Sequence, residues 1–186
     1  MAFDYPVFLS LEGVPVLVVG GGRVAERKVA GLAAAGARVT VVAPQVSAAV
    51  ADQATSVRER EFAAGDCAGQ RLVIAATDDP AVNAAVAAEA TAAGVWVNSA
   101  DDPANCTFAL PAVARRGPVV VAVGTGGASP ALASHLRDRI AADVLDERLA
   151  QAVAELARQR AEIHAAGGST EEIDWAERIR AALGES

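Results

Sequence analysis

The sequence contains few aromatic, cysteine or histidine residues. Aromatic residues make up 4% of the 186 residues, and there are two cysteines and two histidines. Cys67 and Cys106 form no CxxC pair, and neither His135 nor His164 lies in a Cys/His cluster. A permanent structural metal site is therefore not expected, and Cys106 is interpreted as a small buried thiol. Because no secretory signal is visible, we expect a reducing, cytoplasmic setting.

Positive charge is also scarce, and long apolar runs are missing. Lys and Arg total 16 against 23 Asp and Glu, which gives a net charge of −7. Such a chain neutralises few phosphates, which argues against a general nucleic-acid-binding protein. No apolar run reaches the roughly 18 residues that a membrane span requires. We therefore expect neither nucleic acid nor a membrane as a partner.

Small apolar residues are abundant, and valine-rich runs alternate with alanine-rich stretches along the chain. Valine-rich runs predict buried strands, and the alanine-rich stretches between them predict helices. The predicted strands cover residues 14–19, 38–42, 56–60, 72–76 and 95–98, and the predicted helices cover residues 23–35, 46–53 and 80–93. This order indicates an α/β fold, a Rossmann-like doubly wound parallel sheet with helices on both faces.

The pattern changes after about residue 110. Two strands, at 107–113 and 118–123, are predicted to flank a basic turn formed by Arg115, Arg116 and Gly117. A helix is predicted to begin at Pro130 with Ser129 as its N-cap. A last helix is predicted to begin at Ser169 or Thr170, with Glu171 and Glu172 in its first turn. The predicted parts are therefore residues 1–110, 111–145 and 146–186.

A glycine-rich loop follows the first predicted strand. It has the spacing G-x-G-x-x-A, with Gly20, Gly22 and Ala25 in the three fixed positions, and it also contains Gly21, Arg23 and Val24. The first glycine permits a tight turn, the second lets the backbone approach a pyrophosphate, and the alanine permits close packing of helix on strand. Free N–H groups at the helix N-terminus then attract the anion. A glycine turn without a ligand is the less favoured alternative.

The residue that usually binds the adenosine ribose is missing. An acidic side chain is expected at the end of the second strand of a dinucleotide-binding unit. This chain has Ala43 and Pro44 there, followed by Gln45, and no arginine replaces the acid to bind a 2′-phosphate. The residues therefore only favour NAD over NADP.

Polar residues follow the predicted strands at 72–76 and 95–98, at the edge of the sheet where ligands bind. Thr77 and Asp78 end one strand, Asn98 ends the next, and Asp101 comes three residues later. Asp78 is interpreted either as a contact to the nicotinamide ribose or as a turn residue. Asp101 is interpreted either as part of an Asp-Pro turn or as a carboxylate that accepts a proton beside the nicotinamide. Asp79 is interpreted as a helix N-cap.

A second glycine pair stands before the Ser129 cap. Thr125, Gly126 and Gly127 lead into a helix N-terminus that can bind a substrate carboxylate. Arg115 and Arg116 precede this loop and suit a substrate with several negative charges. The alternative for each arginine is a solvated basic surface.

Together these segments resemble the precorrin-2 dehydrogenase family, which includes the N-terminal part of siroheme synthase. The resemblance covers about residues 5–140, in the family's order. It is carried by residues 5–11, 16–44, 75–83, 97–103, 108–111 and 124–133. Thr125 stands where the family often has serine, His135 where arginine is common, and Ser99-Ala100 where Val-Val is frequent. Residues after about 146 match weakly.

The resemblance implies an NAD-dependent oxidation of precorrin-2 to sirohydrochlorin by a homodimer, with residues 111–145 as the dimerisation and substrate region. Some members also insert ferrous iron as a ferrochelatase. Asp101 falls on the family's catalytic aspartate, and an absent ribose acid is usual in this family. NAD contacts are implied at Gly20, Gly21, Gly22, Arg23, Val24, Ala43, Pro44, Thr77 and Asn98. The alternatives are a non-catalytic nucleotide-sensing domain and an NAD-dependent dehydrogenase of another substrate.

Overall fold

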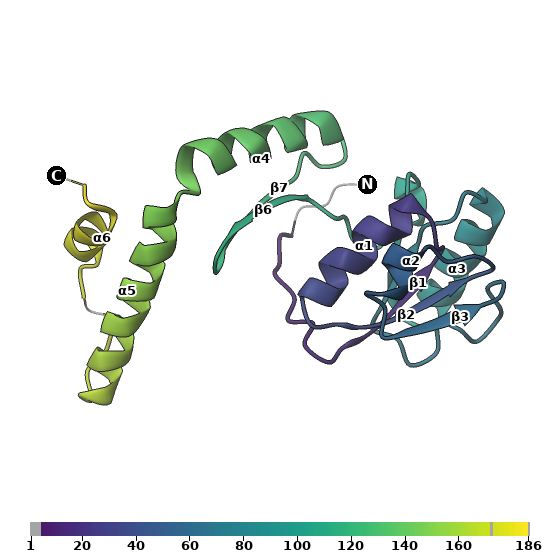
Figure 1. Cartoon of the computed structure of the whole chain (residues 1–186), viewed down its shortest axis with the longest axis horizontal. Helices are drawn as coiled ribbons and strands as arrows, with labels where there is room; N and C mark the ends of the chain where they lie inside the picture. Colours follow the sequence, from purple (N-terminus) through teal and green to yellow (C-terminus); the bar gives the residue numbers. More distant parts are fainter. Residues whose placement is uncertain (1–4, 172, 186) are drawn as a thin grey trace. The chain divides into compact units, whose positions relative to one another are not determined.

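The computed structural model describes residues 5–171 and 173–185. The chain divides into two units, of which the first ends at Leu110 and the second begins at Pro111. Figure 1 labels the elements of both units. The sequence-based boundary between residues 145 and 146 falls within the second unit and stays a prediction. Among the described residues, no helix is both long enough and apolar enough to cross a membrane.

The first unit is a five-stranded parallel sheet with the strand order β3-β2-β1-β4-β5. The predicted doubly wound, Rossmann-like fold is therefore confirmed. Its strands are β1 (Pro15–Val19), β2 (Arg38–Ala43), β3 (Ser56–Glu59), β4 (Leu72–Ala75) and β5 (Trp96–Ser99). Its helices are α1 (Arg23–Ala34), α2 (Ala48–Ala51) and α3 (Pro80–Ala92), with a short 3-10 turn, η1, at Pro103–Asn105.

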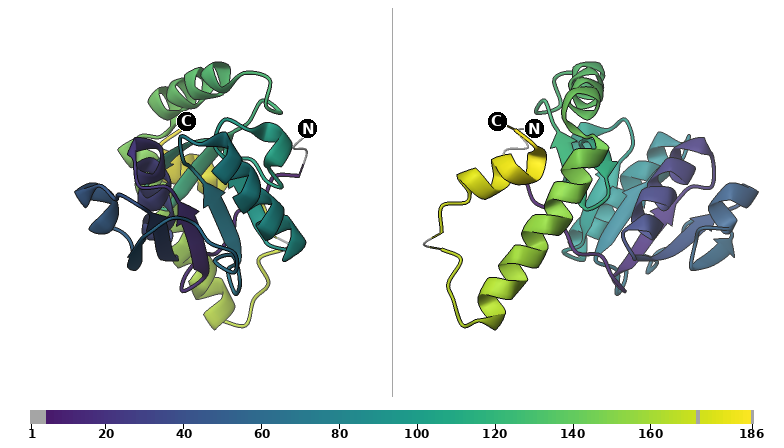
Figure 2. Two further views of the ribbon diagram at one scale, coloured as in Figure 1. Left: turned by 90° about the vertical axis from the view of Figure 1, so that its right-hand side faces the viewer. Right: turned by 60° about the vertical axis from the view of Figure 1, so that its left-hand side comes forward.

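Two apolar cores lie on opposite faces of this sheet. Val16 and Val18 of β1 pack with α1 and α2, whereas Leu17 and Val19 pack with α3. Figure 2 shows α1 and α3 on the two sides of the strands. Since successive side chains of a strand point to opposite faces, a sheet covered on both faces requires an unbroken apolar strand. This explains the continuous run of valine and leucine in β1.

The strand register brings the loops after the strands to one edge of the sheet. Val19 of β1 lies beside Val42 of β2 and Ala75 of β4, and Ala75 in turn lies beside Ser99 of β5. The segments that follow these residues therefore leave the sheet at its carboxyl edge, where open α/β sheets bind ligands.

The second unit contains a two-stranded antiparallel sheet and three helices. The elements are β6 (Ala112–Arg116), β7 (Val119–Val123), α4 (Pro130–Val144), α5 (Glu147–Ala165) and α6 (Ala176–Leu183). Arg115 and Arg116 end strand β6, so the prediction of a basic turn was wrong. The turn begins at Gly117, which adopts a positive φ of 54°.

Two further predictions need correction. The strand predicted from Thr107 begins only at Ala112, because the backbone and hydroxyl of Thr107 bond to Val97 of β5. The last helix begins at Ala176 and not at Ser169 or Thr170. The Ser169 hydroxyl accepts a hydrogen bond from Glu171 N within a turn, and the Trp175 indole donates to Thr170 O. Glu172 lies outside the described residues.

Asp66 anchors the loop that leads from β3 to β4. Its carboxylate accepts two hydrogen bonds from Arg60, at 2.6 and 2.7 Å, and one from Arg58 at 3.1 Å. It also accepts one from Ala63 N at 3.0 Å. The Asp66 side chain is 5% exposed, and the hydrogen bonds from Arg60 are the main cause that lowers its pKa to about 2.

Replacing Asp66 by asparagine is expected to destabilise the protein at neutral pH by about 2 kcal/mol. The pKa of Asp66 is lower in the folded than in the unfolded chain. Its carboxylate therefore stabilises the fold fully when the pH is above the pKa that Asp66 has in the unfolded chain. This stabilisation is lost as the pH falls from about 4 to about 2. Urea unfolding at several pH values measures this. A variant as stable as the parent protein at pH 7 would contradict the prediction.

Candidate functional site

The first glycine of the loop after β1 is required by the backbone. Gly20 has a φ of +124°, and its N–H donates to Val42 O at 2.9 Å, which joins the loop to β2. A Cβ atom at this position would lie 2.3 Å from Ala76 O, in the segment after β4. Only glycine combines this conformation with this close approach. The sequence-based role of Gly20 in a tight turn agrees with this geometry.

The middle glycine is required by packing, which the G-x-G-x-x-A spacing does not indicate. A Cβ atom on Gly21 would lie 2.1 Å from Gln45 O and 2.8 Å from the Cα of Val46. Ser47 N donates to Gly21 O at 3.0 Å. The segment after β2 therefore packs in direct backbone contact with the glycine loop.

The third glycine is open, and it starts a helix that has no side-chain cap. Gly22 is the N-cap of α1, and a Cβ atom there would meet nothing within 4 Å. Side chains cap the other helices from α2 to α5, namely Ser47, Asp79, Ser129 and Asp146. The first N–H groups of α1 are therefore available for an anion. Ala25 is fully buried under the loop, as the spacing predicts.

These features fit the pyrophosphate of a dinucleotide. The open N-terminus of α1 supplies N–H donors and the positive end of a helix dipole. Arg23 is exposed beside it, and Val24 packs against the core on the α1 side. Ala43 is buried at the end of β2, and Pro44 is exposed after it. Arg58 of the neighbouring strand β3 and Arg60 after it donate hydrogen bonds to Asp66. Because these arginines already have a partner, a 2′-phosphate is not favoured, and NAD is favoured over NADP.

The loop after β4 is fixed by a residue that the sequence analysis did not single out. Asn83 Oδ1 accepts from Thr77 N at 3.1 Å and from the Thr77 hydroxyl at 2.8 Å, and Asn83 Nδ2 donates to Thr77 O at 2.9 Å. Asn83 is buried in the first turn of α3. Asp79 caps α3 by accepting from Ala81 N at 2.8 Å, as predicted. Asp78, between Thr77 and Asp79 in the sequence, is exposed.

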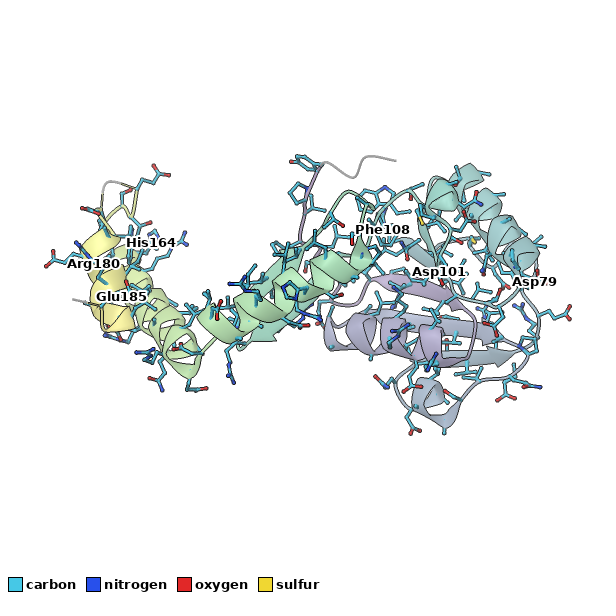
Figure 3. All side chains as sticks on the ribbon, turned by 90° about the horizontal axis from the view of Figure 1, so that it is seen from above. Asp79, Asp101, Phe108, His164, Arg180 and Glu185 are labelled. Carbon is cyan, nitrogen blue, oxygen red and sulfur yellow. The ribbon has the colours of Figure 1, made fainter. Side chains whose placement is uncertain are left out.

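The loop after β5 contains the candidate catalytic carboxylate. Asp101 has a φ of 58°, and among the described residues it is the one non-glycine residue with a positive φ. Such strain is concentrated at functional sites. The Asp101 side chain is exposed; Figure 3 labels it together with Asp79, in the loops that follow β5 and β4. Asn98 is buried at the end of β5 and donates to Phe108 O at 3.0 Å.

Lys28 of α1 belongs to the surroundings of Asp101. Its sequence position, within the helix predicted over residues 23–35, does not mark it as a site residue, because single charges in helices normally face solvent. Burial is the main cause that lowers the pKa of Lys28, and Arg27 adds to it. The charge of Asp101 acts in the opposite direction. A half-buried ammonium group thus lies within electrostatic range of the candidate catalytic carboxylate.

The second glycine loop lies in the second unit. Gly126 and Gly127 have φ values of 58° and 80° and are exposed. The Thr125 hydroxyl donates to Ser129 O at 3.0 Å and accepts from Ser129 N at 3.1 Å, so it closes this loop. Ser129 caps α4 by accepting from Leu132 N at 3.2 Å, as predicted.

The two predicted substrate arginines have different surroundings. Arg115 is exposed on β6, whereas Arg116 donates from Nε to Leu145 O at 3.1 Å, at the end of α4. Arg116 therefore has a structural partner within its own unit. Within residues 5–171 and 173–185, no group of three or more His, Cys, Asp or Glu side chains is arranged to hold a metal ion.

Comparisons with known proteins place the chain among proteins of siroheme synthesis by similarity of sequence. The family described as "Putative NAD(P)-binding" matches residues 7–112, and the family described as "Sirohaem biosynthesis protein central" matches residues 116–142. A siroheme synthase of Methylococcus capsulatus is 52% identical over 142 residues, which are 74% of this chain and 30% of that protein. A siroheme synthase of Methylobacillus flagellatus is 41% identical over 186 residues, which are 97% of this chain and 40% of that protein.

A solved structure extends the similarity to the fold. The structure of "SirC, precorrin-2 dehydrogenase" superposes with a TM-score of 0.72 at 31% identity, covering 97% of this chain and 87% of that one. This chain spans only about a third of the length of the siroheme synthases that it matches. The agreement in sequence and in fold shows that the chain belongs to the precorrin-2 dehydrogenase family, whose relatives include the siroheme synthases.

Proposed function

We propose that this chain oxidises precorrin-2 to sirohydrochlorin with NAD. The observation that carries the proposal is the uncapped, glycine-rich N-terminus of α1, located at the same sheet edge as the loop that bears Asp101. The oxidation removes a hydride and a proton from the reduced tetrapyrrole. A dinucleotide site and a nearby proton acceptor are the two parts that this chemistry requires.

The first unit supplies the residues for the cofactor. Gly20 forms the tight turn, backbone N–H groups of Gly21 to Val24, Gly22 among them, bind the pyrophosphate, and Ala43 and Pro44 flank the adenosine ribose. Thr77, Asp78 and Asn98 belong to the nicotinamide end, and Asn83 fixes the first of them. NAD, when bound, supplies the hydride acceptor.

Asp101 accepts the proton that leaves the tetrapyrrole. Its carboxylate is exposed on a loop at the carboxyl edge of the sheet, and the Lys28 ammonium group lies within electrostatic range. The ionised carboxylate is the form that accepts a proton.

The substrate carries several carboxylates, and the chain has a net charge of −7, so local positive groups must bind it. In the second unit, the exposed backbone of Gly126 and Gly127 beside Thr125 and the side chain of Arg115 are suited to this. Arg116 contributes charge from its fixed position.

We also propose that the second unit forms a homodimer. Helix α4 leaves Leu132, Leu136 and Val144 exposed, and exposed apolar side chains of this size are typical of protein interfaces. Burying them against a second copy removes this surface from water.

Anaerobic incubation of the purified chain with enzymatically prepared precorrin-2 and NAD tests the activity. We expect formation of NADH together with the absorption spectrum of sirohydrochlorin, and a lower rate with NADP. Reactions without protein measure spontaneous oxidation. If NAD binds but neither product forms, the proposed function is wrong, and the chain is either a nucleotide-sensing domain or a dehydrogenase of another substrate.

A further inference from the structure

The segment after β5 is held together by the thiol of Cys106. This side chain is buried, with 6% of the residue exposed, and it follows directly after η1. Cys106 Sγ accepts a hydrogen bond from Ser99 N at 3.1 Å. It also lies 3.3 Å from Ser99 O and 3.3 Å from Asp102 O, either of which can accept its proton. One sulfur atom thus contacts the backbone on both sides of Asp101.

The residue between these contacts has an unusual backbone conformation. Asp101 adopts a φ of 58°, which side chains with a Cβ atom rarely occupy. Such a conformation persists only where the surrounding structure determines it. Since the backbone conformation sets the direction of the Cα–Cβ bond, it also sets where the Asp101 carboxylate points.

We propose that Cys106 is a positioning residue for Asp101. Its sulfur holds the turn from Ser99 to Asp102 in the left-handed conformation that directs the carboxylate of Asp101. This inference rests on the proposed function for its kinetic consequences, whereas the conformation of the turn is measurable without substrate or cofactor.

The protonation state of Cys106 supports this role. Burial is the main cause that raises the pKa of the thiol, and the hydrogen bond with the Ser99 backbone and the charge of Lys28 only partly oppose it. At neutral pH the sulfur therefore carries a proton and can donate as well as accept. A side chain that merely fills space needs neither property, so a substitution of similar size that cannot form hydrogen bonds separates the two roles.

The test compares Cys106→Val, Cys106→Ser and Cys67→Val. Valine at position 106 fills the space without hydrogen bonds, whereas serine retains a donor and an acceptor. Cys67 is the matched control, because it is also buried but packs in the core on the α3 side, with its sulfur 3.9 Å from Val86 O. The backbone φ of Asp101 is measured by NMR on the free protein, and kcat and KM are measured with precorrin-2 and NAD.

In Cys106→Val we expect the φ of Asp101 to leave the left-handed region and kcat to fall roughly tenfold or more, with KM for NAD within about twofold. Cys106→Ser is expected to keep the φ of Asp101 and a kcat within about threefold of the parent protein. Cys67→Val is expected to change neither.

A folded Cys106→Val protein with the parent φ at Asp101 and the parent kcat would overturn the inference. If Cys106→Val does not fold, Cys106→Ala removes the sulfur without adding a branched side chain and is compared in the same way. If the parent protein does not oxidise precorrin-2, the proposed function fails, and the φ of Asp101 in the variants still decides whether Cys106 holds the turn.

Discussion

Replacing Asp101 by asparagine is expected to lower kcat for precorrin-2 oxidation by about 10²- to 10⁴-fold, the usual contribution of a general base. Asparagine has nearly the same shape and tolerates the left-handed backbone that Asp101 adopts. It cannot accept the proton that leaves the tetrapyrrole. The variant should therefore fold and bind NAD as the parent protein does, while single-turnover rates of sirohydrochlorin formation fall.

The neighbouring carboxylate is the matched control. Asp102 is half-buried, and its Oδ2 accepts a hydrogen bond from Asn105 Nδ2 at 2.6 Å. Asp102→Asn retains a side-chain oxygen for this bond, so we expect kcat within about threefold of the parent value. Equal losses in both variants would show that Asp101 acts through the structure of the turn. Full activity in Asp101→Asn would remove its assignment as the proton acceptor.

Alanine substitutions in the glycine loop are expected to separate folding from cofactor binding. In Gly20→Ala, the new Cβ atom would lie 2.3 Å from Ala76 O, on a backbone with φ +124°. Strain and overlap together are expected to destabilise the free protein by about 3 kcal/mol. In Gly22→Ala, the Cβ atom enters open space, so stability should stay within about 0.5 kcal/mol of the parent value.

The same Gly22→Ala protein is expected to bind NAD about tenfold more weakly or worse, because the methyl group occupies the approach of the pyrophosphate. Thermal unfolding of the free protein and calorimetric titration with NAD measure the two effects. Wild-type affinity for NAD in Gly22→Ala would mean that the cofactor does not use the open N-terminus of α1.

The sheet and the glycine loop were predictable from sequence because their signals are local. An apolar run such as Val16–Val19 is interpretable by itself, and so are caps such as Asp79 and Ser129. The prediction that a strand begins at Thr107 was wrong, because Thr107 is hydrogen-bonded to Val97 of β5 and not to β7. Sequence spacing does not reveal such a contact. A tertiary contact thus determined where the hairpin begins.

The candidate site was predictable only in part, for the same reason. Asp101 was found through its place after a strand and through the family resemblance. Lys28, Asn83 and Cys106 are brought to the site by folding, from α1, from α3 and from the end of η1. A single lysine, asparagine or cysteine in the sequence carries no signal that distinguishes such a neighbour from an ordinary helix or core residue.

The close seating of Gln45 on Gly21 has a consequence for engineering the cofactor preference. The carbonyl of Gln45 occupies the space that a Cβ atom at Gly21 would need. The segment after β2 and the glycine loop after β1 are therefore in direct backbone contact, and neither can move without the other. Lengthening the segment after β2 to introduce a 2′-phosphate site would therefore also displace the glycine loop that binds the pyrophosphate. A change of preference toward NADP is therefore best sought by side-chain replacement at constant loop length, in which the backbone of residues 43–47 keeps its course.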